Sequence, residues 1–155
     1  MNIEVKNLNK KFDTFELKNI SIKVPKGKII GLLGKNGTGK STLIKIINDL
    51  LTIDSGSVLV NGKNIGVESK KIISYLPERT YLDKTMTVKQ VLEYFKDFYD
   101  NFDMKKAENL LKDLNLDIDM KISKMSKGMQ EKVQLVLVMS RQADLYILDE
   151  PLGGV

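Results

Sequence analysis

The sequence predicts an α/β fold in which a mostly parallel sheet is flanked by helices and carries an N-terminal antiparallel β subdomain and an inserted helical subdomain. Two apolar runs, residues 29–33 and 145–148, show no alternation and are typical of strands covered on both faces. Near the N-terminus, by contrast, apolar and polar residues alternate as in strands with one solvated face. From about residue 86 to residue 141 the apolar residues recur at helical spacing, which indicates an inserted helical segment.

The composition excludes several kinds of chemistry. The 155 residues fit one domain or part of one, and they include no cysteine and no histidine. Disulfides, thiolate metal sites and a histidine general base are therefore excluded. No apolar run has signal-peptide length or approaches the ~20 residues that span a bilayer, so we expect a soluble chain that is not exported.

The positive charge does not by itself indicate a nucleic-acid partner. The net charge is +5, but only Arg79 and Arg141 among the 25 basic residues are arginine, the side chain that base readout and bidentate phosphate contacts favour. The lysines are also dispersed among acidic residues. We therefore expect no nucleic-acid partner.

The first third of the chain predicts strands, a glycine loop and a helix in succession. Ile3 and Val5 begin one alternating segment, and residues 20–24 form a second one, so we expect an antiparallel pair. The buried strand 29–33 leads directly into a glycine-rich stretch, and residues 40–51 then keep helical spacing.

Turn and capping signals mark the middle of the chain. Asn61 and Gly62 predict a tight turn after a strand, and the apolar strand 72–76 follows. Thr87 to Gln90 form a capping box that opens a helix, and a second helix is expected to start near Asp103.

The glycine-rich stretch fits a phosphate-binding loop. Residues 34–41, GKNGTGKS, match the pattern GxxxxGK[ST] at every fixed position and stand between an expected strand and an expected helix. Glycine has no side chain to block a close approach, so the loop can turn successive N–H groups toward an anion while the helix adds the positive end of its dipole. These features predict a P-loop NTPase core that binds a nucleoside triphosphate.

Individual roles follow from the pattern. Lys40 is expected to reach the β- and γ-phosphates and to act in catalysis, and the Ser41 hydroxyl is expected to ligate Mg²⁺. The residues of this loop that are predicted to bind the nucleotide are Gly34, Asn36, Gly37, Thr38, Gly39, Lys40, Ser41 and Thr42.

The strand at residues 145–148 is followed by two carboxylates. A nucleotide site that holds a metal also needs a carboxylate near that metal, and the end of a buried strand can place one there. Asp149 is the candidate metal ligand. Glu150 is the candidate for polarising the attacking water, a catalytic role that no histidine of this chain can take.

A third segment carries a family resemblance. Residues 123–130, SKMSKGMQ, resemble the signature motif of ABC-type ATPases, whose usual core is LSGGQ, and they precede a helix and the acidic strand in that family's order. Together with the phosphate loop these motifs cover nearly the whole chain. The LPE and SKGMQ segments are more similar to the bacterial ABC-2 class of transporters than to the large multidomain exporters.

The resemblance extends to individual residues. Ser126, Lys127 and Gly128 stand where the signature of this family reaches across a dimer to the nucleotide on the other subunit, although Lys127 replaces a glycine. By the same analogy, Phe12 stands where an aromatic residue stacks on adenine. Glu78 stands where the family commonly has a glutamine that senses Mg²⁺ and contacts the membrane subunit, which makes it a further candidate metal ligand.

The resemblance implies an ATPase subunit of a membrane transporter, which we expect to be an exporter. It implies ATP and Mg²⁺ as ligands, a homodimer or a heterodimer with a related subunit, transmembrane permease partners, and a cytoplasmic place on the inner face of the cell membrane. Residues 1–155 would form a partial nucleotide-binding domain, with 1–85 and 142–155 as the β and phosphate-loop core and 86–141 as the helical signature subdomain.

The end of the chain departs from the family. After EPLGGV the family continues with an Asp that communicates across the dimer, a further strand and a switch histidine. In the family's sheet that strand lies between the strand before the phosphate loop and the strand that ends at Asp149, and without it the backbone groups of both would lack partners. We therefore hypothesise that these residues are a fragment, truncated just before that Asp, of a longer subunit.

Other functions stay open. The same nucleotide chemistry serves ABC-type ATPases outside transport, which bind to ribosomes or DNA. DNA-repair types have a long coiled coil between the phosphate loop and the signature, but the segment between Ser41 and Ser126 is short and contains no sustained heptads. A fragment that binds ATP without hydrolysing it is a second alternative. A phosphate-loop kinase for a small molecule would need lid arginines, which a chain with two arginines does not favour.

Overall fold

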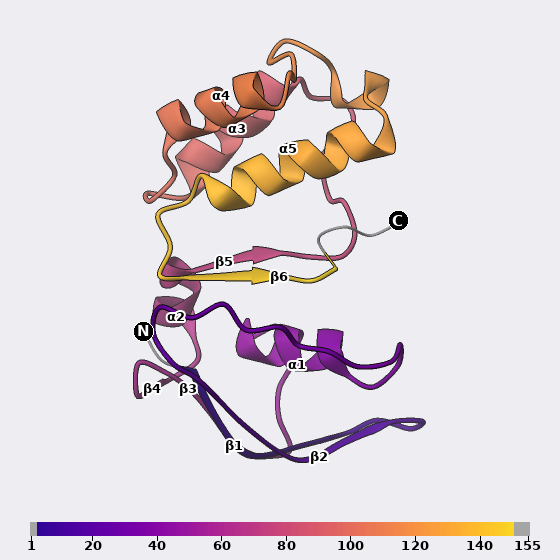
Figure 1. Cartoon of the computed structure of the whole chain (residues 1–155), viewed down its shortest axis with the longest axis vertical. Helices are drawn as coiled ribbons and strands as arrows, with labels where there is room; N and C mark the ends of the chain where they lie inside the picture. Colours follow the sequence, from indigo (N-terminus) through magenta and orange to yellow (C-terminus); the bar gives the residue numbers. More distant parts are fainter. Residues whose placement is uncertain (1–2, 151–155) are drawn as a thin grey trace. The chain divides into compact units, whose positions relative to one another are not determined.

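The computed structural model describes residues 3–150 and divides between Ile73 and Ser74 into two compact units. The first unit contains an antiparallel sheet with helices, and the second contains two strands and a group of helices (Figure 1). The α/β class predicted from the sequence is therefore confirmed. The chain ending that departs from the ABC-type pattern, residues 151–155, lies outside the described residues.

The sheet of the first unit has four strands. They are β1 (Ile3–Lys11), β2 (Glu16–Val24), β3 (Ser55–Val60) and β4 (Lys63–Asn64), in the spatial order β2-β1-β3-β4. All pairs are antiparallel, and β1 lies between β2 and β3. The alternation that predicted the first strand appears as burial, because Ile3, Val5 and Leu8 of β1 are buried.

The turn between β3 and β4 confirms the tight-turn prediction. Asn61 and Gly62 have φ of +53° and +76°, and Val60 pairs with Lys63 across them. Two successive positive φ values are what a two-residue hairpin needs to match the twist of its strands. Asn and Gly are the residues that adopt this conformation at least cost.

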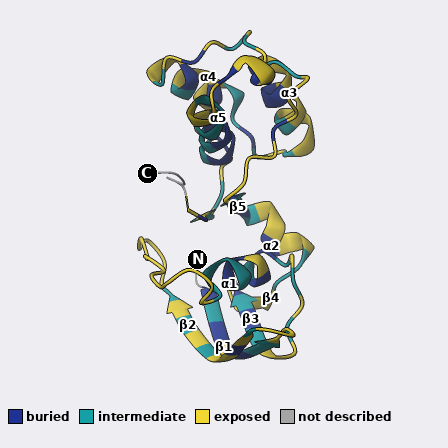
Figure 2. Ribbon diagram, turned by 90° about the vertical axis from the view of Figure 1, so that its right-hand side faces the viewer, coloured by how far each residue is buried: buried dark blue, intermediate teal, exposed yellow. Residues whose placement is uncertain are grey.

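Helix α1 (Lys40–Ile47) covers one face of this sheet, and α2 (Val67–Ile72) follows β4 (Figures 1 and 2). Leu43, Ile44 and Ile46 of α1 are buried. The helix ends four residues before the predicted end at residue 51. The cause is local, because the side-chain amide of Asn48 donates to the carbonyl of Ile44 and Asp49 then turns to a φ of +54°.

The second unit places three helices around one core. Strands β5 (Ile73–Leu76) and β6 (Leu145–Leu148) form a two-stranded sheet. The helical part contains α3 (Val88–Phe98), α4 (Met104–Asp113), the 3₁₀ turn η1 (Ile122–Lys124) and α5 (Lys127–Met139). Leu92 of α3, Leu111 of α4 and Leu137 of α5 meet in the hydrophobic core of this unit and are almost fully buried.

Both predicted helix starts in this unit are confirmed. The Thr87 hydroxyl accepts a hydrogen bond from the Gln90 N–H at 3.3 Å, and the Gln90 side chain accepts one from the Thr87 N–H at 2.9 Å, which closes the capping box of α3. Asp103 caps α4 by accepting from the Lys106 N–H. The division into a core and a helical subdomain over residues 86–141 stays a prediction.

One predicted strand is wrong for this structure. Residues 29–33 have no strand conformation, and the side chains of Ile29 and Leu33 are more than nine-tenths exposed. A strand persists only when its backbone N–H and C=O groups pair with neighbours, and no strand within residues 3–150 is hydrogen-bonded along this segment. The segment is thus apolar in sequence and uncovered in the structure.

Candidate functional site

The loop at residues 34–39 has the close backbone geometry that its glycines predict. Gly37 and Gly39 have φ of +80° and +93°, a region that other residues rarely adopt. A Cβ added at Gly34 would lie 2.8 Å from the Thr38 hydroxyl oxygen, and one at Gly39 would lie 2.5 Å from the Phe15 ring. A larger residue at Gly34 or Gly39 would therefore force the Thr38 or Phe15 side chain to shift.

Lys40 folds back over this loop. Its ammonium group donates hydrogen bonds to the carbonyl oxygens of Gly34 at 2.7 Å and Lys35 at 2.9 Å. The Thr38 hydroxyl also donates to the Lys35 carbonyl, at 2.8 Å. The positive charge of Lys40 is therefore held inside the curve of the loop, which is where the motif predicts that phosphate oxygens would meet it.

Helix α1 begins at the end of the loop with its N–H groups toward it. Gly39 is the N-cap residue, and among the described residues no side chain caps this helix start and no acidic residue stands in its first turn. Ser41 and Thr42 lie in that first turn, and Asn36 lies exposed in the loop. An anion at this end would meet the positive end of the helix dipole without competition from a carboxylate of α1.

Phe12 is connected to the loop through a second aromatic ring. The Phe12 side chain is about one-third exposed and stacks on Phe15, with the ring centroids 6.3 Å apart. Phe15 in turn packs against Gly39, together with Leu17 of β2. The turn between β1 and β2 thus connects the ring of Phe12, for which the family resemblance implies stacking on adenine, to the phosphate-binding loop through Phe15, which the sequence analysis did not single out.

The carboxylates predicted for the site lie in the second unit, at the ends of β5 and β6. Asp149 is buried, and its N–H donates to the Leu76 carbonyl at 2.9 Å. The phenol of Tyr75 on β5 donates a hydrogen bond to Asp149. Burial, followed by the negative charges of Asp149 and Glu78, raises the pKa of Tyr75 to about 12.

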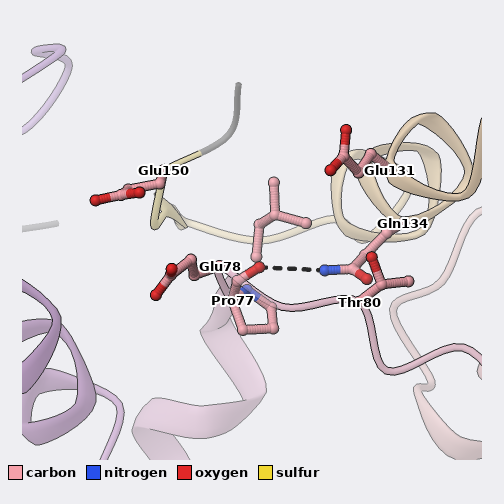
Figure 3. Close-up of a pocket in the computed structure, with 7 residues that line it drawn as sticks. Pro77, Glu78, Thr80, Glu131, Gln134 and Glu150 are labelled. Atoms are coloured by element: carbon pink, nitrogen blue, oxygen red, sulfur yellow. Dashed lines mark hydrogen bonds between the residues drawn. The ribbon is translucent and has the colours of Figure 1, made fainter. Parts of the chain in front are cut away.

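Glu78 and Glu150 lie beside each other, because each follows the end of one of the two paired strands. Both line a small cavity of about 20 Å³, with Glu78 and Glu150 on one side and Glu131 and Gln134 of α5 on the other (Figure 3). Such a volume holds about one water molecule. Glu150 has a φ of +48°, an unusual backbone conformation for this residue type.

The signature-like residues form the exposed start of α5. Ser126 is the N-cap residue, and its hydroxyl accepts a hydrogen bond from the Met129 N–H at 3.3 Å. Lys127 is largely exposed, with its ammonium group 3.6 Å from the Glu131 carboxylate. A Cβ added at Gly128 would meet no atom within 4 Å, so this side of the helix start is open.

The predicted site residues therefore form two groups. The phosphate-loop residues and Phe12 belong to the first unit, and Glu78, Asp149, Glu150 and the signature residues belong to the second. Sequence reasoning missed Phe15 and Gln134. No local signal marks either of them, because an apolar ring in a turn and a glutamine in a helix are ordinary features.

A family model described as ABC transporter matches residues 17–153. The chain belongs to the ABC transporter family. The matched range includes the phosphate loop, Glu78, the signature-like segment and the acidic strand end, whereas Phe12 lies before it.

Curated ABC transporter proteins are similar over nearly the whole chain. The ATP-binding protein YtrB of Bacillus subtilis is 33% identical over 99% of this chain and 53% of its own length. The zinc import ATP-binding protein ZnuC of Rickettsia conorii is 35% identical over 99% of this chain and 64% of its own length. The chain thus spans roughly half to two thirds of the length of these ABC relatives.

A solved structure supports the same family and fold. An ABC transporter ATP-binding protein of Pyrococcus furiosus matches with a TM-score of 0.87 and 27% identity, over 100% of this chain and 78% of the other. This likeness confirms the P-loop ATPase fold predicted from the sequence. Within residues 3–150, no helix is both long enough and apolar enough to cross a bilayer.

Proposed function

We propose that the full-length protein carrying this ABC chain binds ATP with Mg²⁺, hydrolyses it and so drives a membrane transporter. The observation that carries the proposal is the phosphate loop at residues 34–41, whose glycine geometry, inward lysine and uncapped helix start are combined in a chain of the ABC family. Each of these features favours a polyphosphate anion.

ATP binding is proposed to use the first unit. The backbone N–H groups from Gly37 to Thr42, with the side chains of Asn36 and Thr38, would surround the phosphates. Lys40 would exchange its two carbonyl partners for phosphate oxygens, a charge-assisted contact that is stronger than its present hydrogen bonds. The exposed ring of Phe12 would stack on the base.

Hydrolysis is proposed to use the carboxylates of the second unit. In nucleotide sites Mg²⁺ is usually held by one or two protein oxygens together with phosphate oxygens, where it neutralises developing charge. Ser41 and Asp149 are the proposed protein ligands, with Glu78 as a further one. Glu150 would orient the attacking water and accept its proton.

The dimer is proposed to complete the site. The exposed start of α5 offers the Ser126 hydroxyl, the N–H groups near Gly128 and the positive charge of Lys127 to a nucleotide held by a second subunit. This second subunit would be a copy of the protein or a related subunit. Separation after hydrolysis would convert the free energy of ATP binding into movement of the partners.

Transmembrane permease subunits are the proposed partners, and the protein would lie on the cytoplasmic face of the membrane. We propose export as the direction, because the LPE and SKGMQ segments are similar to the ABC-2 class. Copurification of the full-length protein with membrane proteins is the expected result. Copurification with rRNA would instead favour an ABC-type ATPase outside transport.

The test of hydrolysis is the Glu150→Gln variant of the full-length protein. Removing the proton acceptor while keeping the side-chain size should lower the rate of phosphate release by about 10² to 10⁴-fold and leave ATP affinity unchanged. Glu108→Gln, at an exposed glutamate of α4, is the matched control and should behave as wild type. Undiminished phosphate release from Glu150→Gln would remove Glu150 from the catalytic role.

A further inference from the structure

Gln134 is a buried polar residue of α5 that contacts the loop carrying Glu78. Its side chain is only 3% exposed. Its amide nitrogen donates to the carbonyl of Pro77 at 3.2 Å and to that of Arg79 at 3.4 Å (Figure 3). Its amide oxygen accepts a hydrogen bond from the Tyr81 N–H at 3.3 Å.

These three contacts surround one residue of the proposed site. Pro77 and Arg79 are the two neighbours of Glu78, so the amide of Gln134 fixes the backbone on both sides of the Glu78 side chain. A buried glutamine without such partners would carry the full desolvation cost of its amide. The three hydrogen bonds instead tie the Gln134 amide to the loop of residues 77–81.

Helix α5 joins Gln134 to the signature-like residues. The same helix begins with Ser126, Lys127 and Gly128, the proposed contacts to the second nucleotide. A rotation or shift of α5 would act through Gln134 on the backbone of residues 77–81. Glu78 lines the same small cavity as Glu150, the proposed water-polarising residue (Figure 3).

We propose that Gln134 is a positioning residue for ATP hydrolysis, which sets the orientation of Glu78 and links it to the signature end of α5. This inference rests on the proposed function. In the proposed role, Gln134 contacts neither the nucleotide nor the metal and acts only through the loop of residues 77–81. A residue of this kind affects turnover because outer contacts orient the groups that contact the reacting atoms.

The variant for the test is Gln134→Met in the full-length protein, because methionine is similar in length and removes all three hydrogen bonds. Its matched control is Ser74→Ala. Ser74 of β5 is also buried, and its hydroxyl donates to the Val138 carbonyl of α5 at 2.8 Å, so this control removes a different hydrogen bond of α5 without touching the Glu78 loop.

We expect Gln134→Met to lower kcat by about 10- to 100-fold while the affinity for ATP measured without Mg²⁺ changes by less than about twofold. In a Glu78→Gln background the same substitution should have almost no further effect on kcat, because its route of action is already removed. Equal losses in Gln134→Met and Ser74→Ala, or full additivity with Glu78→Gln, would overturn the proposal.

A second variant covers the case in which Gln134→Met does not fold. Gln134→Asn keeps the amide but is one methylene shorter and cannot reach all three backbone groups. Hydrogen exchange at the Tyr81 amide should become at least about tenfold faster in this variant, with a lower kcat. Faster exchange with an unchanged kcat, or unchanged exchange, would contradict the proposal. If wild type itself releases no phosphate, the proposed function fails, and the exchange measurement still tests the hold of Gln134 on the loop.

Discussion

The backbone of Glu150 adopts a left-handed conformation that glutamate rarely adopts. Within the described residues, six non-glycine residues have positive φ, and the five others are all Asn or Asp, whose short side chains tolerate this region. Glutamate has no such tolerance, so its φ of +48° must be imposed by its surroundings. Such backbone strain concentrates at functional sites, which supports the catalytic role proposed for this residue.

Tyr75 makes a testable contribution to the pH dependence of stability. Its pKa is raised to about 12 in the folded protein from an ordinary value of 10.0, so the folded state holds the phenol proton more tightly than the unfolded state does. The resulting stability is fully present below about pH 10 and is lost as the pH rises toward about 12. Tyr75→Phe should therefore reduce the fall in the urea midpoint of unfolding between about pH 10 and pH 12.

The control for this prediction is Tyr94→Phe, at an exposed tyrosine of α3. That variant should show the same alkaline fall in the urea midpoint as wild type. Burial also raises the pKa of Tyr81, so Tyr75→Phe should remove only part of the fall. An alkaline fall in Tyr75→Phe as steep as in wild type would show that the phenol of Tyr75 does not contribute.

Single residues differ in how far the sequence alone could find them. Lys40 and the loop glycines were predictable because the phosphate motif fixes their spacing, and the left-handed Gly37 and Gly39 follow from it. Gln134 was not predictable, because the importance of its amide depends on backbone groups more than 50 positions away in the chain. The helical pattern of the sequence indicates only that position 134 is polar.

At the scale of elements, the predictions succeeded where the signals were local. The caps at Thr87 and Asp103 and the Asn61 turn are decided by a few adjacent residues, and all three formed as expected. The strand at 29–33 failed because pairing depends on neighbours far away in the sequence. An apolar run indicates that a segment suits a buried strand, but it does not indicate whether a partner strand is present.

The capping box of α3 gives a prediction at this scale. Thr87→Ala in the full-length protein removes the acceptor of the Gln90 N–H and should lower the free energy of unfolding by about 1 kcal/mol. Thr87→Ser keeps the hydroxyl and should stay close to wild type. Urea denaturation with an unchanged m-value is the measurement. A loss of the same size in Thr87→Ser would assign the effect to the lost methyl group rather than to the cap.

At the scale of the whole molecule, the proposed chemistry needs both units. The first unit carries the phosphate loop and the aromatic ring of Phe12, and the second carries Asp149, Glu150 and the start of α5. Neither group alone accounts for both nucleotide binding and hydrolysis. The family match over residues 17–153 includes the phosphate loop of the first unit and the carboxylates and α5 of the second, which is why the proposal concerns a complete cycle of ATP binding and hydrolysis.

Lys40 of the phosphate loop is the residue through which ATP binding is tested. The measurement is the equilibrium affinity of the full-length protein for ATP, in wild type, Lys40→Ala and the neighbouring control Lys35→Ala. Lys40→Ala removes the ammonium group held inside the loop and should weaken binding by at least about tenfold, as expected for the loss of a charge-assisted contact. Lys35→Ala keeps the backbone carbonyl that accepts from Lys40 and should bind as wild type. Equal affinity in wild type and Lys40→Ala would contradict ATP binding at the loop of residues 34–41.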